Sequence, residues 1–420
     1  MSETTPGTAI GRSRHAVPFP SKGIWPGLAT VPRSPLRAAV AERLFRHAVR
    51  TIPVRVELPC GRVLGCGGPD APVMRLHRPA HFFHRLGADA KIGFGEAYMV
   101  GDWTSPDVAD VLTPFAARMA TLVPRPMQTL RRVAERTQPS AEENDLAGAR
   151  ENIHRHYDLS NDLFSTFLDE TMTYSSAWFA DPEQDLVDAQ LRKIDGVLDL
   201  AGVGPETHVL EIGTGWGALA IRAALRGARV TTLTLSAEQK NLAERRIQAA
   251  GVADRVQVVL RDYREAHGSY DAVVSVEMIE AVGKGYWPTY FATLDRLVRT
   301  GGRIGLQAIT MPHDRMLATA NAYTWIHKYV FPGGLIPSVE AIEDAVAQHT
   351  GLRVLHDRAF GQDYAQTLRL WRRRFLDRWQ EVAALGFDET FRRMWEFYLA
   401  YSEAGFRAGY LDVHQFCLAK

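Results

Sequence analysis

The stretch THVLEIGTGWG, residues 207–217, decides the fold. A run of β-branched and apolar residues passes directly into a glycine-rich turn of the pattern E-x-G-x-G-x-G, which begins at Glu211 and contains Gly213, Gly215 and Gly217. Glycines let the backbone turn sharply and approach a ligand without an intervening Cβ atom, at the carboxyl edge of a first strand. The helical segment ALAIRAALRG follows at once. The stretch therefore predicts a strand, a ligand-binding loop and a helix, the first unit of a doubly wound fold.

Short β-branched runs alternate with helical periodicity along the chain from this point. The five runs are THVLEI (207–212), RVTTLTL (229–235), RVQVVL (255–260), YDAVVSV (270–276) and RIGLQAI (303–309). Strands that alternate with helices form parallel sheets with helices on both faces. We therefore predict an α/β fold with a Rossmann-like, doubly wound parallel sheet, capped by aromatic-rich helical segments beyond residue 310.

The glycine-rich loop by itself fits either a dinucleotide or S-adenosylmethionine. A nicotinamide site usually has an acidic residue at the end of the second strand for the ribose, but this strand ends in Thr234, Leu235 and Ser236. That ending favours S-adenosylmethionine. Gln239 is interpreted either as a cofactor contact or as half of a capping box with Ser236. Asp262, after the third strand, could accept a hydrogen bond from an adenine amino group or be a solvated loop residue.

The length of 420 residues predicts two folded units. Residues 1–30 are rich in Gly, Pro, Ser and Thr and are expected to be a flexible lead-in. We place a mainly helical, basic N-terminal domain at 31–136, a polar linker at 137–150 and the α/β domain at 151–420. Residues 1–140 contain 19 Lys and Arg against 10 Asp and Glu, a balance of +9, which leaves 30 against 38, or −8, for the remainder.

Two stretches of the predicted N-terminal domain combine cations with apolar residues. In the first, Arg37, Arg43, Arg46 and Arg50 flank an apolar stripe at helical spacing, and in the second, residues 111–134, four arginines occur with no acid. Such surfaces attract anionic lipid headgroups, and a solvated helical face is the alternative for either stretch. No nucleic-acid-binding motif accompanies them, so an anionic membrane surface is the expected partner and nucleic acid is not.

The composition argues against several other classes of protein. With 46% hydrophobic and 23% charged residues, the chain has no apolar run long enough to span a bilayer. Its opening segment lacks the apolar stretch of a secretory signal, so we expect a cytoplasmic protein, peripheral at the inner face of the plasma membrane. Cys60, Cys66 and Cys417 show neither disulfide nor zinc spacing, and no metal is expected.

Motifs along nearly the whole chain resemble the cyclopropane-fatty-acid synthase family of S-adenosylmethionine-dependent methyltransferases. They are HYDLSNDLF (156–164), MTYSSAWF (172–179), VLEIGTGWG (209–217), LTLSAEQ (233–239), SVEMIEAVG (275–283), KYVFPGG (328–334), DYAQTLRLW (363–371) and YSEAGFR (401–407). By this resemblance the cofactor contacts would be Tyr174, Ser175, Gly213, Gly215, Thr234, Leu235, Gln239, Asp262 and Tyr263. The basic first domain, with GFGEAYMVGDW at 93–103, resembles that of full-length members that act on phospholipid at the bilayer.

The resemblance also implies a bound bicarbonate ion as the base, held in that family by a Cys, a Glu, a His, an Ile main chain and a Tyr. Glu280, Ile309 and Tyr364 match three of these positions. Ser176 stands where the family usually has Cys, and Gln307 where it usually has His. Both side chains can hydrogen-bond an oxyanion. These five residues are the predicted catalytic residues, and bicarbonate is the predicted second cofactor.

The implied reaction is methyl transfer from S-adenosylmethionine to the cis double bond of an oleoyl-type acyl chain in a membrane phospholipid. An isolated alkene is a poor nucleophile, so the site must hold it against the sulfonium methyl in a dry pocket and tolerate a carbocation. Aromatic faces stabilise cations. The candidates, for which core packing is the alternative, are Trp178, Tyr286, Tyr323, Trp325 and Tyr329.

The fate of the cation decides the product. Proton loss from the new methyl closes a cyclopropane, whereas a hydride shift before proton loss leaves a methylene group. The sequence resembles the actinobacterial branch that makes the methylene precursor of 10-methyl acids such as tuberculostearic acid, and we predict this product. A separate reductase would be needed to saturate it, since the chain shows one glycine-rich cofactor loop. The alternatives are a cyclopropane synthase, a small-molecule natural-product C-methyltransferase and a lipid-binding protein without catalysis, and a homodimer is left open.

Overall fold

The structure is a computed structural model that describes residue 25, residues 27–119 and residues 160–420. The predicted linker, nearly all of the lead-in and three arginines of the second basic stretch lie outside these residues. The domain boundaries at residues 136 and 150 therefore stay predictions. In the described parts of the chain, no helix is both long and apolar enough to cross a bilayer.

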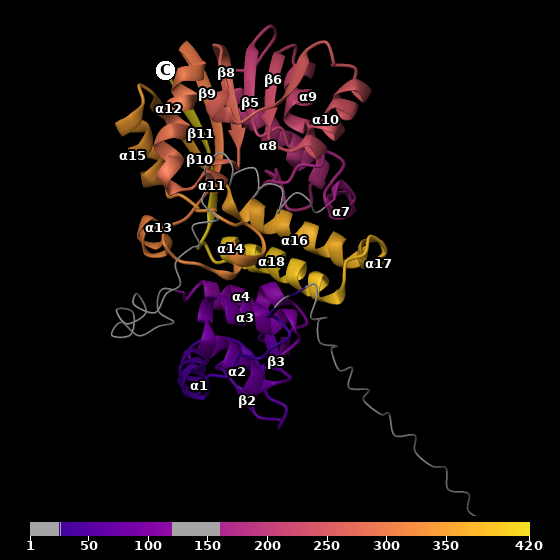
Figure 1. The fold of residues 1–420 in the computed structure, drawn as a ribbon, viewed down its shortest axis with the longest axis vertical. Coiled ribbons are helices and arrows are strands. Elements are labelled where there is room, and N and C mark those ends of the chain that lie inside the picture. The colour runs from indigo at the N-terminus through magenta and orange to yellow at the C-terminus, as the bar shows by residue number, and fades with distance from the viewer. Residues whose placement is uncertain (1–24, 26, 120–159) are drawn as a thin grey trace, which may run out of the picture.

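The N-terminal part is a small sheet packed against helices (Figure 1). Its elements are α1 (Pro35–Val49), β1 (Arg55–Glu57), β2 (Val63–Leu64), β3 (Val73–Leu76), α2 (Pro79–Ala88), α3 (Ala90–Met99), β4 (Trp103–Thr104) and α4 (Val108–Ala116). The strand order is β2-β1-β3-β4, with β1 and β3 parallel. The carboxylates of Asp89 and Asp107 cap α3 and α4 by accepting backbone N–H groups. Most residues in these elements are helical, as predicted, and the small sheet is made of strands of two to four residues.

The α/β part contains a sheet of seven strands in the order β10-β11-β9-β8-β5-β6-β7. The strands are β5 (His208–Ile212), β6 (Arg229–Thr234), β7 (Val256–Leu260), β8 (Tyr270–Val276), β9 (Val298–Thr310), β10 (Arg353–Ala359) and β11 (Asp412–Ala419). The first five are the predicted runs, and they pair in parallel, which confirms the α/β fold. The sheet is mixed, however, because β11 pairs antiparallel with both β9 and β10.

Helices cover both faces of this sheet (Figure 1). On one face lie α8 (Leu186–Leu200), α9 (Ala218–Leu225) and α10 (Ala237–Ala249), and on the other lie α12 (Trp287–Leu297) and α15 (Val339–His349). Side chains alternate across a strand, so Val209 of β5 packs with α8 and α9 while Leu210 packs with α12. Burial of both faces explains why these strands are rich in apolar and β-branched residues.

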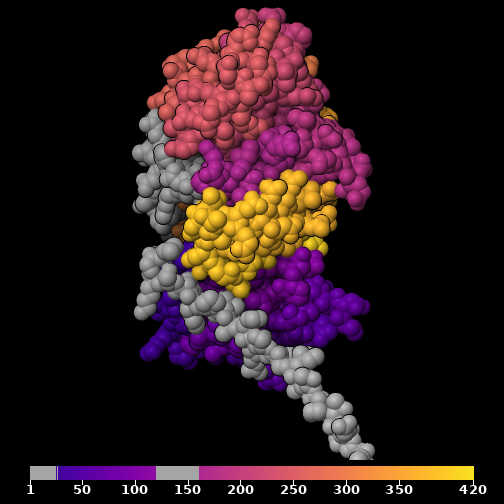
Figure 2. Space-filling view, turned by 90° about the vertical axis from the view of Figure 1, so that its right-hand side faces the viewer, coloured from indigo at the N-terminus to yellow at the C-terminus, as the bar shows by residue number. Residues whose placement is uncertain are grey.

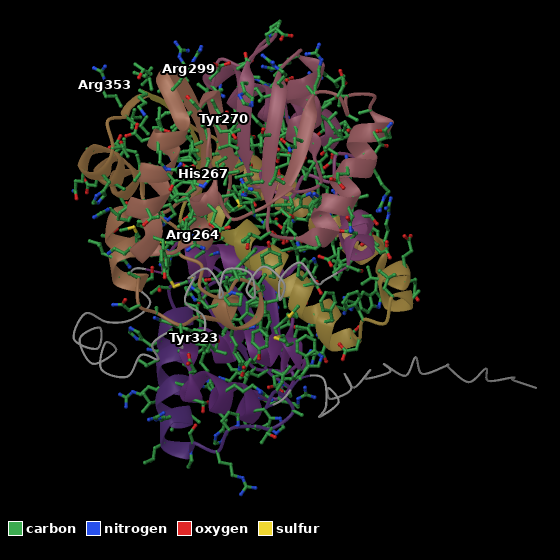
Figure 3. The ribbon with its side chains drawn as sticks, turned by 45° about the horizontal axis from the view of Figure 1, so that its top comes forward. Arg264, His267, Tyr270, Arg299, Tyr323 and Arg353 are labelled. Carbon is green, nitrogen blue, oxygen red and sulfur yellow. The ribbon has the colours of Figure 1, made fainter. Side chains whose placement is uncertain are left out.

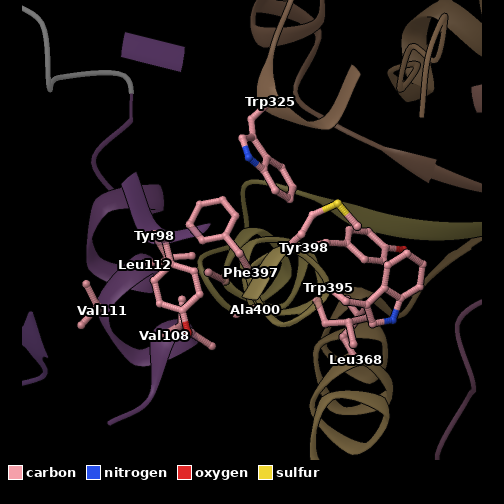
Figure 4. Packing of buried hydrophobic residues seen from close by; sticks show 14 of the residues in the cluster. Tyr98, Val108, Val111, Leu112, Trp325, Leu368, Trp395, Phe397, Tyr398 and Ala400 are labelled. Carbon is pink, nitrogen blue, oxygen red and sulfur yellow. The ribbon is translucent and has the colours of Figure 1, made fainter. Parts of the chain in front are cut away.

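The C-terminal helices form a layer between the sheet and the N-terminal part, seen in yellow in Figure 2. They are α16 (Gly361–Asp377), α17 (Trp379–Ala384) and α18 (Glu389–Arg407), and shorter helices elsewhere are α7 (Asn161–Phe167), α11 (Ile279–Val282), α13 (His313–Thr319) and α14 (Trp325–Tyr329). Phe397 of α18 packs against Tyr98 of α3 and Trp325 of α14, with ring centroids 5.6 and 4.8 Å apart (Figure 4). The N-terminal part and the C-terminal helices therefore share one hydrophobic core.

An ion network also crosses this junction, in which Arg372 and Glu403 are buried and Asp107 is partly exposed. The guanidinium of Arg372 in α16 lies 3.0 Å from the carboxylate of Asp107, the α4 cap, and 3.0 Å from that of Glu403 in α18. Both carboxylates raise the pKa of Arg372, although its burial opposes them. Removing one partner of a buried ion network leaves the others uncompensated, so these charges tie the N-terminal part to the C-terminal helices.

The carboxyl edge of the parallel strands faces this helical layer. Figure 3 shows Tyr270 and Arg299, near the starts of β8 and β9, toward the top of the molecule, and Arg264, which follows β7, at the opposite edge. Ligands bind outside the carboxyl edge in open α/β sheets. The candidate site is therefore expected between this edge and the C-terminal helices.

Candidate active site

A cavity lies at the carboxyl ends of β5 and β6, beside the glycine-rich loop. Eight of the nine predicted cofactor contacts line it, namely Tyr174, Ser175, Gly213, Gly215, Thr234, Leu235, Gln239 and Tyr263. The sheet and the preceding loop thus bring together residues that are far apart in the sequence. Such a concave site with convergent polar groups suits a small cofactor.

The backbone of the glycine-rich loop requires glycine. Gly213, Gly215 and Gly217 have φ angles of 96°, 52° and 90°, in the left-handed region that glycine tolerates best. A Cβ atom on Gly213 would also lie 2.8 Å from the Sδ atom of Met278. The indole N–H of Trp216 donates to Asn161 Oδ1 at 2.7 Å, which fixes the loop to α7. The cavity wall is therefore formed by backbone that can approach a ligand closely.

Hydrogen bonds at the end of the second strand bear on both interpretations of Gln239. Ser236 Oγ accepts the backbone N–H of Gln239 at 3.1 Å and so caps α10. The Gln239 side chain does not complete a capping box, since its Oε1 accepts the Thr234 hydroxyl at 2.9 Å instead. Gln239 therefore helps to begin the helix through its backbone and lines the cavity with its side chain.

Asp262 is the predicted cofactor contact that the structure does not place on the cavity wall. Its carboxylate accepts two hydrogen bonds from the Arg264 guanidinium, at 2.8 and 2.7 Å, and one from the Arg264 backbone. Three of about four acceptor sites on this carboxylate are therefore occupied by Arg264. The neighbouring Tyr263 lines the cavity in its place.

Two buried ionisable groups that the sequence did not identify as site residues also line the cavity. Burial lowers the pKa of Lys193 to about 8, and burial raises the pKa of Glu211, the first residue of the glycine-rich pattern, to about 8. Lys193 Nζ donates to Ser175 Oγ at 2.5 Å. Lys193 lies among the buried residues of α8, in a stretch of sequence that contains no recognisable motif.

A second group of predicted residues converges on a carboxylate next to this cavity. Glu277 directly follows β8 and lines the cavity. Its Oε1 accepts the backbone N–H of Ser176 at 2.9 Å and the Gln307 side-chain amide at 2.8 Å. Its Oε2 accepts the Tyr364 hydroxyl at 2.8 Å. Three of the five predicted catalytic residues therefore bind the side chain of Glu277, a residue that the sequence did not identify.

A relay of amides fixes the direction of the hydrogen bond from Gln307. The Arg358 guanidinium, which can only donate, binds Gln415 Oε1 at 2.7 Å. Gln415 Nε2 then donates to Gln307 Oε1 at 2.9 Å, across the paired strands β9 and β11. Gln307 Nε2 is therefore left to donate to Glu277. The amide orientation follows from this chain of partners, and it favours an ionised acceptor.

Glu280 lies one turn further along and has fewer partners. Its Oε1 accepts the backbone N–H of Ile309 at 2.5 Å, and its Oε2 is buried without a hydrogen-bond partner. Burial, reinforced by the charge of Glu277, raises the pKa of Glu280 to about 8. Glu280 is thus a neutral acid near pH 7.

These contacts engage the groups that were predicted to donate to a bicarbonate ion, namely those of Ser176, Gln307, Ile309 and Tyr364. The Ser176 hydroxyl donates to the carbonyl of Ala177 at 2.8 Å, and the other groups expected to hold the ion donate to Glu277 or Glu280. An oxyanion in a buried site needs such donors. The residues present therefore do not fit bicarbonate, and the predicted role of Ser176 changes from its side chain to its backbone N–H.

The geometry can be compared with that of known proteins. A protein-family model described as mycolic acid cyclopropane synthetase matches residues 144–416. This chain belongs to that family. The chain is 52% identical to the tuberculostearic acid methyltransferase UfaA1 of Mycobacterium tuberculosis, over 99% of this chain and 97% of that protein. It is 35% identical to the cyclopropane-fatty-acyl-phospholipid synthase of Escherichia coli, over 81% of this chain and 86% of the relative.

Solved structures of the family agree with the α/β part. The cyclopropane synthase MmaA2 of Mycobacterium tuberculosis aligns with a TM-score of 0.61 and 32% identity, over 66% of this chain and 100% of that one. The mycolic acid cyclopropane synthase CmaA1, solved in complex with SAH and CTAB, aligns with a TM-score of 0.59 and 29% identity, over 67% and 99% of the two chains. The predicted resemblance is confirmed, and the chain is an S-adenosylmethionine-dependent methyltransferase.

The aromatic residues proposed to face a cation lie elsewhere in this family member. Trp178 packs between the guanidinium groups of Arg192 and Arg358, with distances of 4.3 and 3.7 Å from the ring centroid. Trp325 is buried in the core, and none of the five candidates is among the residues that line the described cavity. Core packing, the alternative interpretation, fits all five, since Trp325 is buried in a hydrophobic core and the other four pack against one. The aromatic rings that do line the cavity are Tyr174, Trp216 and Tyr263.

Proposed function

We propose that this methyltransferase acts on the cis double bond of an oleoyl-type acyl chain in a phospholipid and leaves a methylene branch, the precursor of a 10-methyl acid. The observation that carries the proposal is the 52% identity, over 99% of the chain, to a tuberculostearic acid methyltransferase. The Escherichia coli relative, whose name specifies a fatty-acyl phospholipid, supports phospholipid as the form of the substrate. A separate reductase would saturate the methylene group.

The cavity supplies what the chemistry needs from the protein. When bound there, S-adenosylmethionine supplies a methyl group on a positively charged sulfur. The glycine-rich loop presents bare backbone to the cofactor, while Thr234 and Gln239 offer polar groups at the end of β6. Tyr174 and Trp216 add aromatic surface to the same cavity. These residues would therefore hold the cofactor where its methyl group can meet a weak nucleophile such as an alkene.

One incubation tests the reaction. The full chain is incubated with S-adenosylmethionine and dioleoyl phospholipid vesicles, and the acyl chains are analysed by mass spectrometry before and after hydrogenation. A methylene product takes up hydrogen under mild conditions, and a cyclopropane of the same mass does not. A cyclopropane product would select the alternative function, cyclopropane-fatty-acyl-phospholipid synthase. Methylation of soluble acceptors without any acyl product would refute both.

The outer face of α1 supports docking at an anionic membrane. The helix buries Ala38, Ala41, Phe45 and Val49 against the rest of the N-terminal part. Of the apolar residues that gave the predicted stripe, Phe45 and Val49 face the core. Leu36 and Val40, however, are 84% and 53% exposed, beside the exposed Arg37 and Arg43. Exposed apolar residues flanked by cations are typical of a helix that lies on an anionic bilayer.

Vesicle binding tests this docking. Each cation near an anionic bilayer contributes about 1 kcal/mol, so replacing Arg37 and Arg43 by Ser should weaken binding roughly 30-fold. The exposed Arg353, at the opposite end of the molecule in Figure 3, provides the matched control, and Arg353→Ser should bind like the unaltered protein. Sedimentation with phosphatidylglycerol vesicles measures the effect, and added salt should reduce binding of the unaltered protein. Equal binding by the double variant would exclude α1 as the docking helix.

A further inference from the structure

Glu277 occupies the point where the cofactor cavity meets the predicted catalytic residues. It lines the cavity together with the glycine-rich loop. Its two oxygens accept three hydrogen bonds, from the backbone of Ser176, the amide of Gln307 and the hydroxyl of Tyr364. These groups belong to three of the residues that the family resemblance assigns to a bicarbonate ion, although Ser176 uses its backbone N–H and not its hydroxyl. A carboxylate of the protein itself is therefore bound by residues expected to bind the small anion.

The backbone of Glu277 is held in a conformation that side chains rarely adopt. Its φ angle is 52°, one of three left-handed non-glycine residues in the described chain, and its N–H donates to the carbonyl of Gln307 at 2.8 Å. Strained backbone of this kind persists where the surrounding structure demands it, and it is frequent at active sites. In this conformation, which glycine would adopt without strain, the Glu277 side chain is directed into the site.

Charges around Glu277 favour its ionised form over that of Glu280. Burial raises the pKa of Glu277, while the three donors and the charge of Lys193 oppose this rise. Glu280 has only backbone donors and feels the Glu277 charge. Two neighbouring buried carboxyl groups cannot both ionise cheaply, and the one with more donors and a nearby cation takes the charge. Glu277 is therefore the carboxylate and Glu280 the neutral acid.

We propose that the Glu277 carboxylate is the proton acceptor of the reaction and stands in place of the bicarbonate ion. The proposal rests on the proposed function, and it makes the enzyme independent of bicarbonate. Ser176, Gln307 and Tyr364 then act as positioning residues that hold the carboxylate beside the methyl acceptor.

The step balances without a further reactant. The π electrons of the alkene form the new carbon–carbon bond to the methyl carbon, and the sulfur–methyl bond breaks with its electron pair on sulfur. A hydride then moves from the methylated carbon to the adjacent cationic carbon. One C–H bond of the new methyl breaks, its electrons form the methylene double bond, and its proton passes to a Glu277 oxygen. The carboxylic acid returns the proton to water after product leaves.

Two variants of Glu277 test the assignment in carbonate-depleted buffer. Glu277→Gln keeps the shape and size of the side chain but removes the base, and turnover should fall on the order of 100-fold or more. Glu277→Gly relieves the left-handed backbone and opens space where the carboxylate was. It should be equally slow without additive and should recover activity with millimolar bicarbonate or acetate. The unaltered enzyme should respond to neither.

Glu206 offers a matched control, because it is also a left-handed non-glycine residue, with φ of 58°, but its side chain is 70% exposed. Glu206→Gly should keep full activity with and without bicarbonate. Stabilisation by S-adenosylmethionine in thermal melts checks that every variant folds and binds cofactor.

The outcomes separate the inference from the proposed function. If the unaltered enzyme gives no acyl product, the proposed function fails, and the assignment of Glu277, which rests on that function, fails with it. If it is active but loses activity on carbonate depletion, or if Glu277→Gln retains near-normal turnover, Glu277 is not the acceptor. A large loss in Glu280→Gln combined with near-normal turnover in Glu277→Gln would assign the proton to Glu280. A cofactor-binding Glu277→Gly variant that no carboxylate or bicarbonate restores would also count against the assignment.

Discussion

Replacing Glu280 by Gln should stabilise the folded protein, and increasingly so as pH rises. Glutamine is neutral at every pH and preserves the size of the side chain and an oxygen to accept the N–H of Ile309. In the unaltered protein, folding raises the pKa of Glu280 from its ordinary value of 4.5 to about 8. Below pH 4.5 the carboxyl group is protonated in both states, so the two proteins should be equally stable with respect to this group.

The magnitude follows from the difference in pKa. Above the unfolded pKa the unfolded chain releases the Glu280 proton while the folded one retains it, so the unaltered protein loses stability as pH rises toward 8. At about 1.4 kcal/mol for each pH unit, the glutamine variant should be more stable by about 3 kcal/mol at pH 7 and by up to about 5 kcal/mol above pH 8. Deleting a buried acid would thus stabilise the protein.

Urea unfolding at a series of pH values, followed by tryptophan fluorescence, measures the difference between Glu280→Gln and the unaltered protein. The exposed Glu206 again supplies the control, and Glu206→Gln should show no such growing difference. A glutamine variant that is less stable at pH 8 would mean that Glu280 is an ionised, stabilised carboxylate in the folded protein. A stability difference that stays constant between about pH 5 and pH 8 would equally refute the reasoning.

Three further predictions test the surroundings of the site. Tyr364→Phe removes a hydrogen-bond donor to Glu277 and so raises the pKa of that base. The acidic limb of the pH–rate profile should therefore move to higher pH by on the order of one to two pH units. An unchanged acidic limb would exclude this contact. Gln415→Leu breaks the relay to Gln307 and should lower turnover roughly 10-fold with little change in cofactor affinity, and a loss confined to affinity would contradict it. Gly95→Ala places a Cβ atom 2.6 Å from the indole of α14. Overpacking should cost about 1–3 kcal/mol and the higher helix propensity of Ala should return about 1 kcal/mol, so the urea midpoint should fall. An unchanged midpoint would show that the junction can adjust.

The sequence was sufficient to predict the five parallel strands and the cofactor loop. Five β-branched runs became β5 to β9, because strands buried on both faces must be apolar and connected by helices. The glycine-rich pattern was also decisive, since the φ angles of Gly213 and Gly217 restrict those positions to glycine. The antiparallel strands β10 and β11 escaped prediction because β11 pairs with strands formed more than fifty residues earlier.

The identity of the base, by contrast, is decided by tertiary structure. The segment SVEMIEAVG contains both Glu277 and Glu280, and by composition alone either could carry the charge. Their difference comes from Ser176, Gln307 and Tyr364, which three separate parts of the fold bring to one of the two carboxyl groups. A local pattern can determine which residues form a strand and a turn. The ionisation of a buried carboxyl depends on donors and charges gathered from distant segments, and only the folded chain sets these.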